Sequence, residues 1–258
     1  MSFDLTKFKQ DIAVDGYSIV ENVFSAPFMD RAKIELESAI GAEASFHGST
    51  DYTDYGMVLL CALYGGIFIE IFDEQKFTEP VETILGEGSI VYGYTSSSMP
   101  PKATNYSSRI HVDCPRLIPD YLTNFGAFIA VSDISEENGA MHYLPASHND
   151  AKEPTADYFE KNCQRAVLEK GAVFFFSPRL WHRGGVNPSN DWRHAITINF
   201  CRPYMKQRID IPRALSHMES SDWSEKVKQK LGFYAQTPIS YEEYYVPPEK
   251  RKFRQKYE

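Results

Sequence analysis

Between Ser89 and Pro203 the sequence consists of short β-branched and aromatic runs separated by Pro, Gly, Asn and Ser, and this pattern constrains the fold most. The runs are SIVYGYTSSS, RIHVD, LTNFGAFIAVSDI, GAMHYLP, GAVFFFSP and HAITINFCRP. Such runs are typical of strands, and the residues between them are typical of turns. Because no long helical pattern separates them, apart from a short one near TADYFEKNC, they predict an antiparallel sandwich or barrel.

The flanking parts of the chain predict a cover for this core. LTKFKQDIAV predicts a helix that Gly16 ends, YSIVENVF predicts a strand, and Ser25 followed by Pro27 predicts a helix to about Ile40. Residues 51–86 have a mixed, mainly helical pattern that includes EPVETILG, and SSDWSEKVKQKLGF predicts a late helix before the charged tail YEEYYVPPEKRKFRQKY. The 258 residues fit one domain. We expect a cover over 1–88, a core over 89–203 and a second cover over 204–258.

Charge and composition exclude several classes of partner. The formal net charge is -8 without a basic cluster, which argues against nucleic acid and weakens the case for a substrate with several phosphates. The sequence contains neither a signal-peptide pattern at its start nor an apolar run of about 18 residues. Its four cysteines are scattered, which fits a reducing compartment. We therefore expect a cytoplasmic protein with no membrane partner, and its oligomeric state stays open.

The segment RIHVDCPR places His111 and Asp113 two positions apart. In an extended segment both side chains would project from one face, about 6 to 7 Å apart along the backbone, which is close enough to bind one cation. Alone, such a triplet is more often a solvated pair. Cys114 would face the opposite way, so we leave it out of the site.

His182 is the candidate for a third ligand. It follows the apolar run GAVFFF and the turn SPRL, and it precedes Gly184 and Gly185, which allow the backbone to pass close to a bound group. A lone histidine here would more often be an ordinary turn residue. An earlier H-x-D in an all-β chain favours the ligand interpretation.

Two imidazoles and one carboxylate are a ligand set with a specific chemical meaning. Structural zinc usually fills four positions with Cys or His, whereas this set leaves octahedral positions open, as in non-haem Fe(II) oxygenases. The open positions can take a bidentate co-substrate and then O2. We therefore predict that His111, Asp113 and His182 are the metal ligands and the catalytic residues.

Arg193 begins the strand RHAITINF, eleven residues after His182. Strand alternation puts Arg193, Ala195 and Thr197 on one face, so a guanidinium and a hydroxyl would lie behind the metal. A planar guanidinium binds a carboxylate bidentately, and the distal carboxylate of 2-oxoglutarate fits this position. The alternative is a structural salt bridge to an acidic residue of the chain.

These motifs carry a family resemblance. I-H-V-D, N-G-A-M-H-Y-L-P-A-S-H and H-R-G-G-V-N-P-S-N-D-W-R, together with DGYSIVENVFS and Y-E-E-Y-Y-V-P-P-E, resemble in this order the phytanoyl-CoA dioxygenase family of Fe(II)/2-oxoglutarate oxygenases. The resemblance covers most of the chain. It implies a double-stranded β-helix, or cupin-like jelly roll, with flanking helices. It also implies iron bound by His111, Asp113 and His182, with Arg193 holding 2-oxoglutarate.

The chain departs from the family pattern at Gly184, where members often have a serine that helps to hold the co-substrate. Thr197, or a serine between 96 and 98 such as Ser98, is our candidate for the missing hydroxyl. His148, in the sequence P-A-S-H, is expected to stabilise a turn. Related halogenating enzymes have Gly or Ala in place of the carboxylate, so Asp113 implies oxygen insertion or desaturation.

The substrate is expected to be a small metabolite, uncharged or modestly polar, since the acidic chain makes a CoA thioester a poor first guess. Arg109, His142 and Arg116 are the candidate substrate contacts, with a structural ion pair as the alternative for Arg109 and a satisfied core histidine for His142. The predicted function is an Fe(II)/2-oxoglutarate-dependent dioxygenase that hydroxylates or desaturates this metabolite and releases succinate and CO2. The alternative is a cupin-like metal-binding module, or a catalytically silent binding protein.

Overall fold

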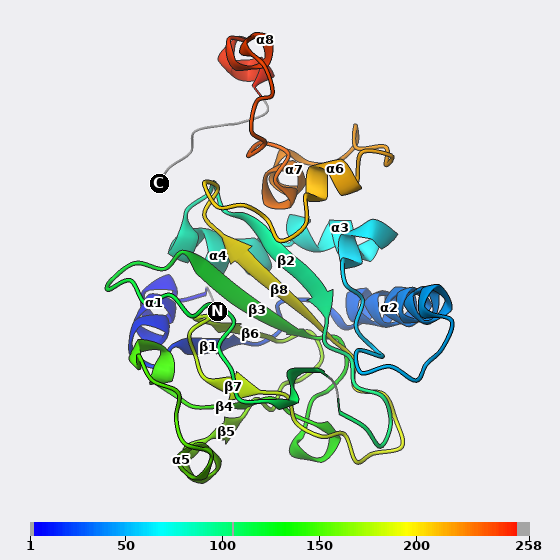
Figure 1. The fold of residues 1–258 in the computed structure, drawn as a ribbon, viewed down its shortest axis with the longest axis vertical. Helices are drawn as coiled ribbons and strands as arrows, with labels where there is room; N and C mark the ends of the chain where they lie inside the picture. The colour runs from blue at the N-terminus through cyan, green and yellow to red at the C-terminus, as the bar shows by residue number, and fades with distance from the viewer. Residues whose placement is uncertain (1–2, 105, 252–258) are drawn as a thin grey trace.

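The computed structural model describes residues 3–104 and 106–251, and two antiparallel sheets form its centre (Figure 1). The larger sheet has the strand order β1-β6-β3-β8-β2, and the smaller has the order β5-β4-β7. The strands are β1 Tyr17–Val20, β2 Ile90–Ser96, β3 Asn124–Ala130, β4 His142–Tyr143, β5 Gln164–Arg165, β6 Val173–Phe176, β7 His182–Arg183 and β8 Ala195–Cys201. This is the predicted jelly-roll core, and the fold class is confirmed.

Helices cover the outer face of the larger sheet and extend the molecule beyond one end of it. The α-helices are α1 Leu5–Val14, α2 Ala26–His47, α3 Ile67–Glu70, α4 Gln75–Leu85, α5 Ala156–Asn162, α6 Ile211–Ala214, α7 Glu225–Leu231 and α8 Tyr241–Tyr244. Short 3-10 helices are η1 Cys61–Tyr64, η2 Ile71–Asp73, η3 Tyr106–Ser108, η4 Glu136–Asn138, η5 Ser147–Asn149 and η6 Pro248–Lys250. None of the described helices combines the length and apolarity that crossing a bilayer requires.

Side chains on the two faces of the larger sheet belong to different core clusters. The outer cluster joins Phe125, Phe175, Ile196 and Ile198 of the sheet to side chains of α1, α2 and α4. The inner cluster joins Phe128, Phe174, Phe176 and Ala195 to side chains of the smaller sheet and its loops, among them Met141 and Tyr143. Because β6 is covered on both faces, its four residues VFFF are all buried and show no polar alternation.

Strand β8 does alternate, and its polar residues identify the face of the sheet that holds the site. Ile196, Ile198 and Phe200 point into the outer cluster. Thr197 and Asn199 therefore point inward, and β8 pairs with β3 and β2 on either side, for example Thr197 with Phe128 and with Thr95. This is the inward face that the sequence predicted for Arg193 and Thr197.

The observed helix boundaries agree with the sequence predictions in most places and differ from them in two. α1 matches LTKFKQDIAV, and Ser25 caps α2 by accepting from the Phe28 amide. α2 continues to His47 instead of ending near Ile40, because its C-terminal stop is Gly48 in the left-handed conformation. α4 begins at Gln75, four residues before EPVETILG. Of the charged tail, residues 252–258 lie outside the described residues.

Candidate metal centre

The backbone around His111 forms a single bridge, not the strand predicted for RIHVD. The His111 amide donates to the His182 carbonyl at 2.9 Å and the His182 amide donates to the His111 carbonyl at 3.0 Å. Pairing ends there because the Asp113 amide donates to the carbonyl of Pro178, in the turn before β7, at 2.8 Å. The strand predicted over 109–113 is therefore wrong in extent. The side chains of His111 and Asp113 nevertheless lie close together, as that prediction implied.

Three side chains converge at this bridge. Asp113 Oδ1 lies 3.5 Å from His111 Nε2 and 3.8 Å from His182 Nε2. The three ligand atoms all lie within 4.8 Å of one another, so one ion between them could contact all three. His182 is buried, with 8% of its side chain exposed, while 34% of the His111 side chain is exposed. The centre is therefore deep on one side and open to solvent on the other.

Both imidazoles are oriented by hydrogen bonds at their outer nitrogens. His111 Nδ1 lies 2.7 Å from the carbonyl of Arg109, and His182 Nδ1 lies 2.8 Å from the carbonyl of Leu180. A carbonyl can only accept, so each Nδ1 carries the proton and each Nε2 presents a lone pair toward Asp113. Metal-binding histidines commonly donate from their outer ring nitrogen to a carbonyl or carboxylate in this way. The donor set of this chain therefore fits a divalent metal ion.

Electrostatics keep the Asp113 carboxyl ionised. Burial raises its pKa, but the His111 hydrogen bond, the neighbouring His182 and the Asn199 hydrogen bond outweigh burial and lower the pKa to about 2. The amide of Asn199, on β8, donates from Nδ2 to Asp113 Oδ2 at 3.0 Å. Burial lowers the pKa of His182, which keeps this imidazole neutral and able to bind a metal.

A cavity of about 70 Å³ adjoins these three side chains. Arg193 and Thr197 line it, and Arg193 is almost completely buried, with 2% of its surface exposed. The Arg193 guanidinium lies over the ring of Phe128, 5.6 Å from its centroid. Thr197 Oγ1 lies 2.7 Å from the hydroxyl of Ser97, which also lines the cavity. A guanidinium and two hydroxyls thus face the same small space as the three ligand atoms.

Of the hydroxyl candidates, the structure places Ser97 rather than Ser98 at the cavity. Ser98 is fully buried, and its hydroxyl lies 3.1 Å from Nδ1 of His194, on the opposite face of the strand from Arg193. Gly184 lines the cavity, as its place in the sequence suggested. Gly185 packs against backbone, because an added Cβ would lie 2.5 Å from the carbonyl of Ala140.

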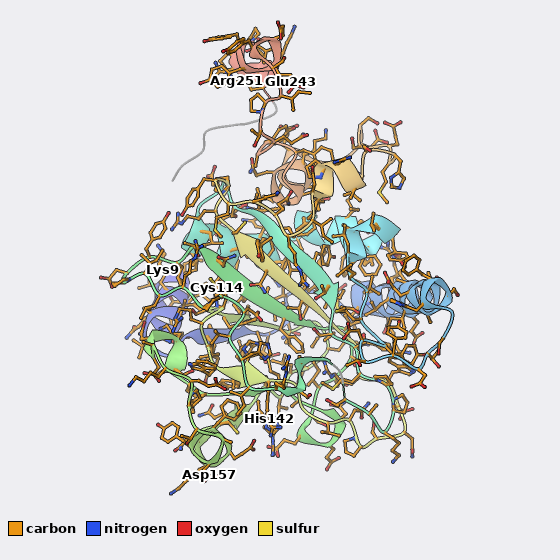
Figure 2. All side chains as sticks on the ribbon, viewed as in Figure 1. Lys9, Cys114, His142, Asp157, Glu243 and Arg251 are labelled. Carbon is orange, nitrogen blue, oxygen red and sulfur yellow. The ribbon has the colours of Figure 1, made fainter. Side chains whose placement is uncertain are left out.

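The three candidate substrate residues lie outside this small cavity. Arg109 contributes its carbonyl to His111, and its side chain is exposed. Arg116 lines a larger cavity next to the metal centre. His142 lies on the small sheet, whose position Figure 2 shows, and lines a third, shallower cavity.

His142 also belongs to a second cluster of possible ligands, together with Glu160 and Cys163. Arg165 Nε lies 3.3 Å from one ring nitrogen of His142 and Arg183 Nη2 lies 3.2 Å from the other. Two cations in contact with the imidazole disfavour a metal ion there. The structure thus supports the metal centre at His111 and not this cluster.

Asn199 is a contact of the site that the sequence reasoning missed. It follows Arg193, Ala195 and Thr197 in the same two-residue alternation, so extending the pattern by one step would have found it.

An antiparallel jelly roll whose inner face carries two histidines, a carboxylate and a buried arginine defines the class of non-haem iron, 2-oxoglutarate-dependent oxygenases. Residues 12–195 match the family model described as phytanoyl-CoA dioxygenase. The match spans well over half of the sequence. The chain therefore belongs to the phytanoyl-CoA dioxygenase family, whose enzymes use Fe(II) and 2-oxoglutarate.

Individual relatives agree with this assignment. Rv1501 of Mycobacterium tuberculosis, an uncharacterised protein, is 28% identical over 251 residues, which cover 93% of this chain and 90% of that protein. Human peroxisomal phytanoyl-CoA dioxygenase is 33% identical over 92 residues, which cover 29% of this chain and 27% of that protein. The alpha-ketoglutarate-dependent carbocyclase SnoK from nogalamycin biosynthesis superposes with a TM-score of 0.64 at 19% identity, covering 87% of this chain and 94% of that chain. The last comparison supports the fold.

Proposed function

We propose that this protein hydroxylates, or alternatively desaturates, a C–H bond of a small-molecule metabolite, with 2-oxoglutarate as co-substrate. The observation that carries the proposal is the convergence of Asp113 Oδ1 with Nε2 of His111 and His182 beside the buried Arg193. A module that only binds metal does not need a buried guanidinium next to the metal. A catalytically silent binding protein would not form succinate from 2-oxoglutarate.

Each residue has a distinct task in this proposal. His111, Asp113 and His182 hold Fe(II) through two neutral nitrogens and one anionic oxygen. Bound Fe(II), 2-oxoglutarate and O2 supply the oxidant for the C–H bond, with release of succinate and CO2. Arg193 binds the distal carboxylate of 2-oxoglutarate with its planar donors, and Thr197 adds a hydroxyl.

The apolar part of the cavity wall has a separate role. Phe128, Met141 and Phe176 line the small cavity and are each at most 6% exposed. Their burial leaves little room for bulk water around the co-substrate, which strengthens the contact between the carboxylate and Arg193.

The first test is the binding of Fe(II) and 2-oxoglutarate without oxygen, followed by turnover. The wild-type protein should show the weak visible band of the Fe(II)-2-oxoglutarate chelate and should form succinate when O2 is added. Asp113→Ala and His182→Ala should each reduce succinate formation more than a hundredfold, because each removes a ligand. Asp157→Ala and His217→Ala, at exposed positions, are the matched controls and should retain it. A ligand variant with full activity would contradict the assignment.

Arg193→Lys separates the oxygenase from a metal-binding module. Lysine keeps the charge but loses the planar pair of donors, so half-saturation by 2-oxoglutarate should need at least about tenfold more co-substrate, while Fe(II) affinity stays unchanged. A wild-type protein that binds Fe(II) but neither shows the chelate band nor consumes 2-oxoglutarate would support the module instead.

A further inference from the structure

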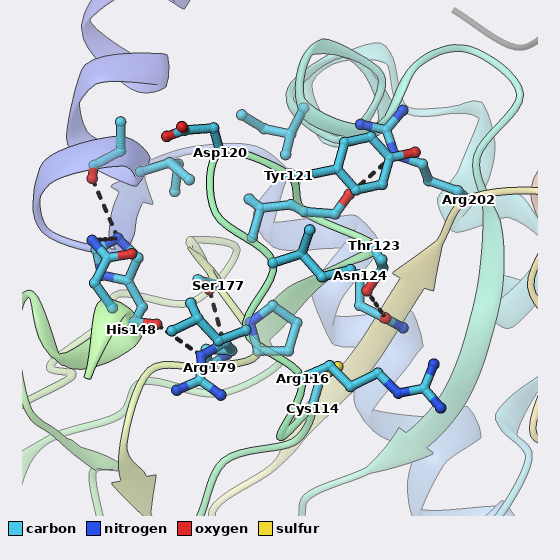
Figure 3. Close-up of a pocket in the computed structure, with 18 of the residues that line it drawn as sticks. Cys114, Arg116, Asp120, Tyr121, Thr123, Asn124, His148, Ser177, Arg179 and Arg202 are labelled. Atoms are coloured by element: carbon cyan, nitrogen blue, oxygen red, sulfur yellow. Dashed lines mark hydrogen bonds between the residues drawn. The ribbon is translucent and has the colours of Figure 1, made fainter. Parts of the chain in front are cut away.

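A second and larger cavity, of about 420 Å³, has Cys114 in its wall, the residue after Asp113. Figure 3 shows residues that line it. It is lined by residues of α1, the end of α4, the segment 114–124 and the turn 177–179. Cys114 lines this cavity while Asp113 lines the small one, and the Pro178 carbonyl accepts from both of their amides. Because Asp113 and Cys114 are consecutive residues, the two cavities share part of their wall at this stretch of backbone.

The charges around this cavity are the reverse of those of the whole chain. Lys9, Arg116, Arg179 and Arg202 line it, and Asp120 is the one acidic side chain among its described lining residues. None of the four cations takes part in an ion pair within the described part of the chain. In a chain of net charge -8, a local excess of cations without carboxylate partners is unusual.

Two of these cations are held in place by neutral groups. Arg179 is only 7% exposed, and its guanidinium donates to the carbonyls of Pro115, His148 and Asp150. Arg202 donates to the carbonyls of Leu122 and Leu85 and lies over the ring of Tyr121, 4.3 Å from its centroid. Carbonyls satisfy the donors but leave the net charge uncompensated, so both positions favour an anion nearby.

Part of the remaining lining is apolar, beside polar side chains such as Thr83, Asn124 and Ser177. Ile12 and Ile84 form the wall on the helix side, and Leu117, Ile118 and Leu122 form the wall on the side of the 114–124 segment. A volume of about 420 Å³ lies within the range of cavities that hold small ligands, roughly 300 to 1,000 Å³. The cavity thus combines space for an apolar body with cations for an acidic group.

We propose that this cavity binds a small organic anion, namely a carboxylate or a phosphate monoester on an apolar body. We also propose that this anionic group is the acidic end of the substrate. The second half of this inference rests on the proposed oxygenase function, since the shared wall places the ligand beside the metal. It revises the expectation of an uncharged or modestly polar substrate, because net charge averages over the whole surface whereas a ligand meets only local charge. Arg116, a candidate substrate contact from the sequence, is then an anion contact.

The binding half can be tested on metal-free protein with three matched probes: 1-naphthoate, 1-naphthyl phosphate and the neutral 1-naphthalenemethanol. Isothermal titration calorimetry should give affinities at least about tenfold higher for an anionic probe than for the alcohol. The ranking of the carboxylate and the phosphate then identifies the acidic group. Raising the salt concentration from 0.05 to 0.5 M should lower the affinity for the anionic probes and leave the affinity for the alcohol unchanged.

Variants place the binding in this cavity. Lys9 and Arg116 make no side-chain hydrogen bond in the described residues, so Lys9→Gln and Arg116→Gln should remove charge without unfolding the wall. Each variant should lower the affinity for the preferred anion about threefold, and the double variant should lower it about tenfold. Arg213→Gln, at an exposed arginine of α6, is the matched control. Equal binding of the alcohol, or an unaffected double variant, would overturn the inference.

Failure of this inference is distinguishable from failure of the proposed function. The anion should leave the Fe(II)-2-oxoglutarate band intact, whereas loss of the band would mean that the probe occupies the Arg193 cavity and would overturn the assignment. A protein that binds the anion but never forms the band would contradict the oxygenase and keep the anion site. Once a mass-shift screen identifies a substrate, the double variant should raise its KM about tenfold at unchanged kcat, and an unchanged KM would overturn the substrate half.

Discussion

Asn199 fixes the outer oxygen of Asp113 and so determines which oxygen faces the two imidazoles. Its Nδ2 donates to Oδ2, while Oδ1 is the oxygen that lies near His111 and His182. Without this hydrogen bond the carboxylate could rotate about its terminal torsion, because such torsions have broad minima. The position of the oxygen that we predict to bind the metal thus depends on a residue of β8 that is not itself a predicted ligand.

The Asn199→Ala variant should therefore bind Fe(II) about 10 to 100 times more weakly, as is typical when an outer partner of a ligand is removed. The measurement is anaerobic titration of Fe(II), with circular dichroism as a check on folding. Asn190→Ala removes an amide from an exposed loop position and should leave the affinity unchanged. An Asn199→Ala protein with wild-type affinity would show that packing alone orients Asp113.

For individual residues, sequence spacing was enough to find the chemical groups but not all of their neighbours. His111, Asp113 and His182 were selected from ligand type and strand periodicity, and the structure brings the three together; their role as iron ligands stays a prediction. Ser97 and Asn199 were not singled out, because choosing among adjacent serines, or extending an alternation, requires knowing the register of β2 and β8. Register depends on pairing between residues about one hundred positions apart, such as Thr95 with Thr197.

Among the secondary-structure elements, those with local signals were predicted well. α1 and the start of α2 follow from an N-cap residue and apolar spacing, and α5 and α7 lie within TADYFEKNC and SSDWSEKVKQKLGF. The bridge at His111 was overestimated as a strand, because its length depends on the two-residue partner β7 and on the Pro178 carbonyl. Such limits are set by tertiary structure, and no local pattern encodes them.

Gly185 provides a prediction about the small sheet. An alanine Cβ there would lie 2.5 Å from the Ala140 carbonyl, so Gly185→Ala should push β7 away from the segment before β4 and lower the free energy of unfolding by more than about 1 kcal/mol. Because β7 carries His182, Fe(II) affinity should fall as well. Gly41→Ala is the matched control: Gly41 lies in α2 with open space around it, and alanine should stabilise the helix by about 0.5 to 1 kcal/mol.

Urea unfolding of both variants measures these changes. Loss of stability in Gly185→Ala without loss of Fe(II) affinity would mean that β7 keeps His182 in place despite the collision. Gly41→Ala should change stability alone, since α2 lies on the outer side of the larger sheet.

Metal binding should raise the stability of the whole protein against unfolding. The three predicted ligands come from segments that only the folded chain brings together, so Fe(II) should bind the native state in preference to the unfolded state. At a free concentration one hundred times Kd, this preference stabilises the fold by about 2.7 kcal/mol. The expected rise in Tm is about 5 °C or more for a chain of this size. An anaerobic thermal melt measures it, and a chelator should reverse it.

The His182→Ala protein is the control for this melt, and its Tm should not respond to Fe(II). An equal rise in both proteins would place the stabilising ion elsewhere, for example at the His142 cluster.

The reciprocal amide pair between residues 111 and 182 also bears on biosynthesis. When a ribosome has just made His111, that residue has nothing to pair with, because His182 is still 71 residues from being synthesised. β1 likewise cannot pair into the sheet until its partner β6 has been synthesised. Iron loading therefore belongs to a late stage of maturation, and a nascent or truncated polypeptide that ends before residue 182 should not acquire the metal.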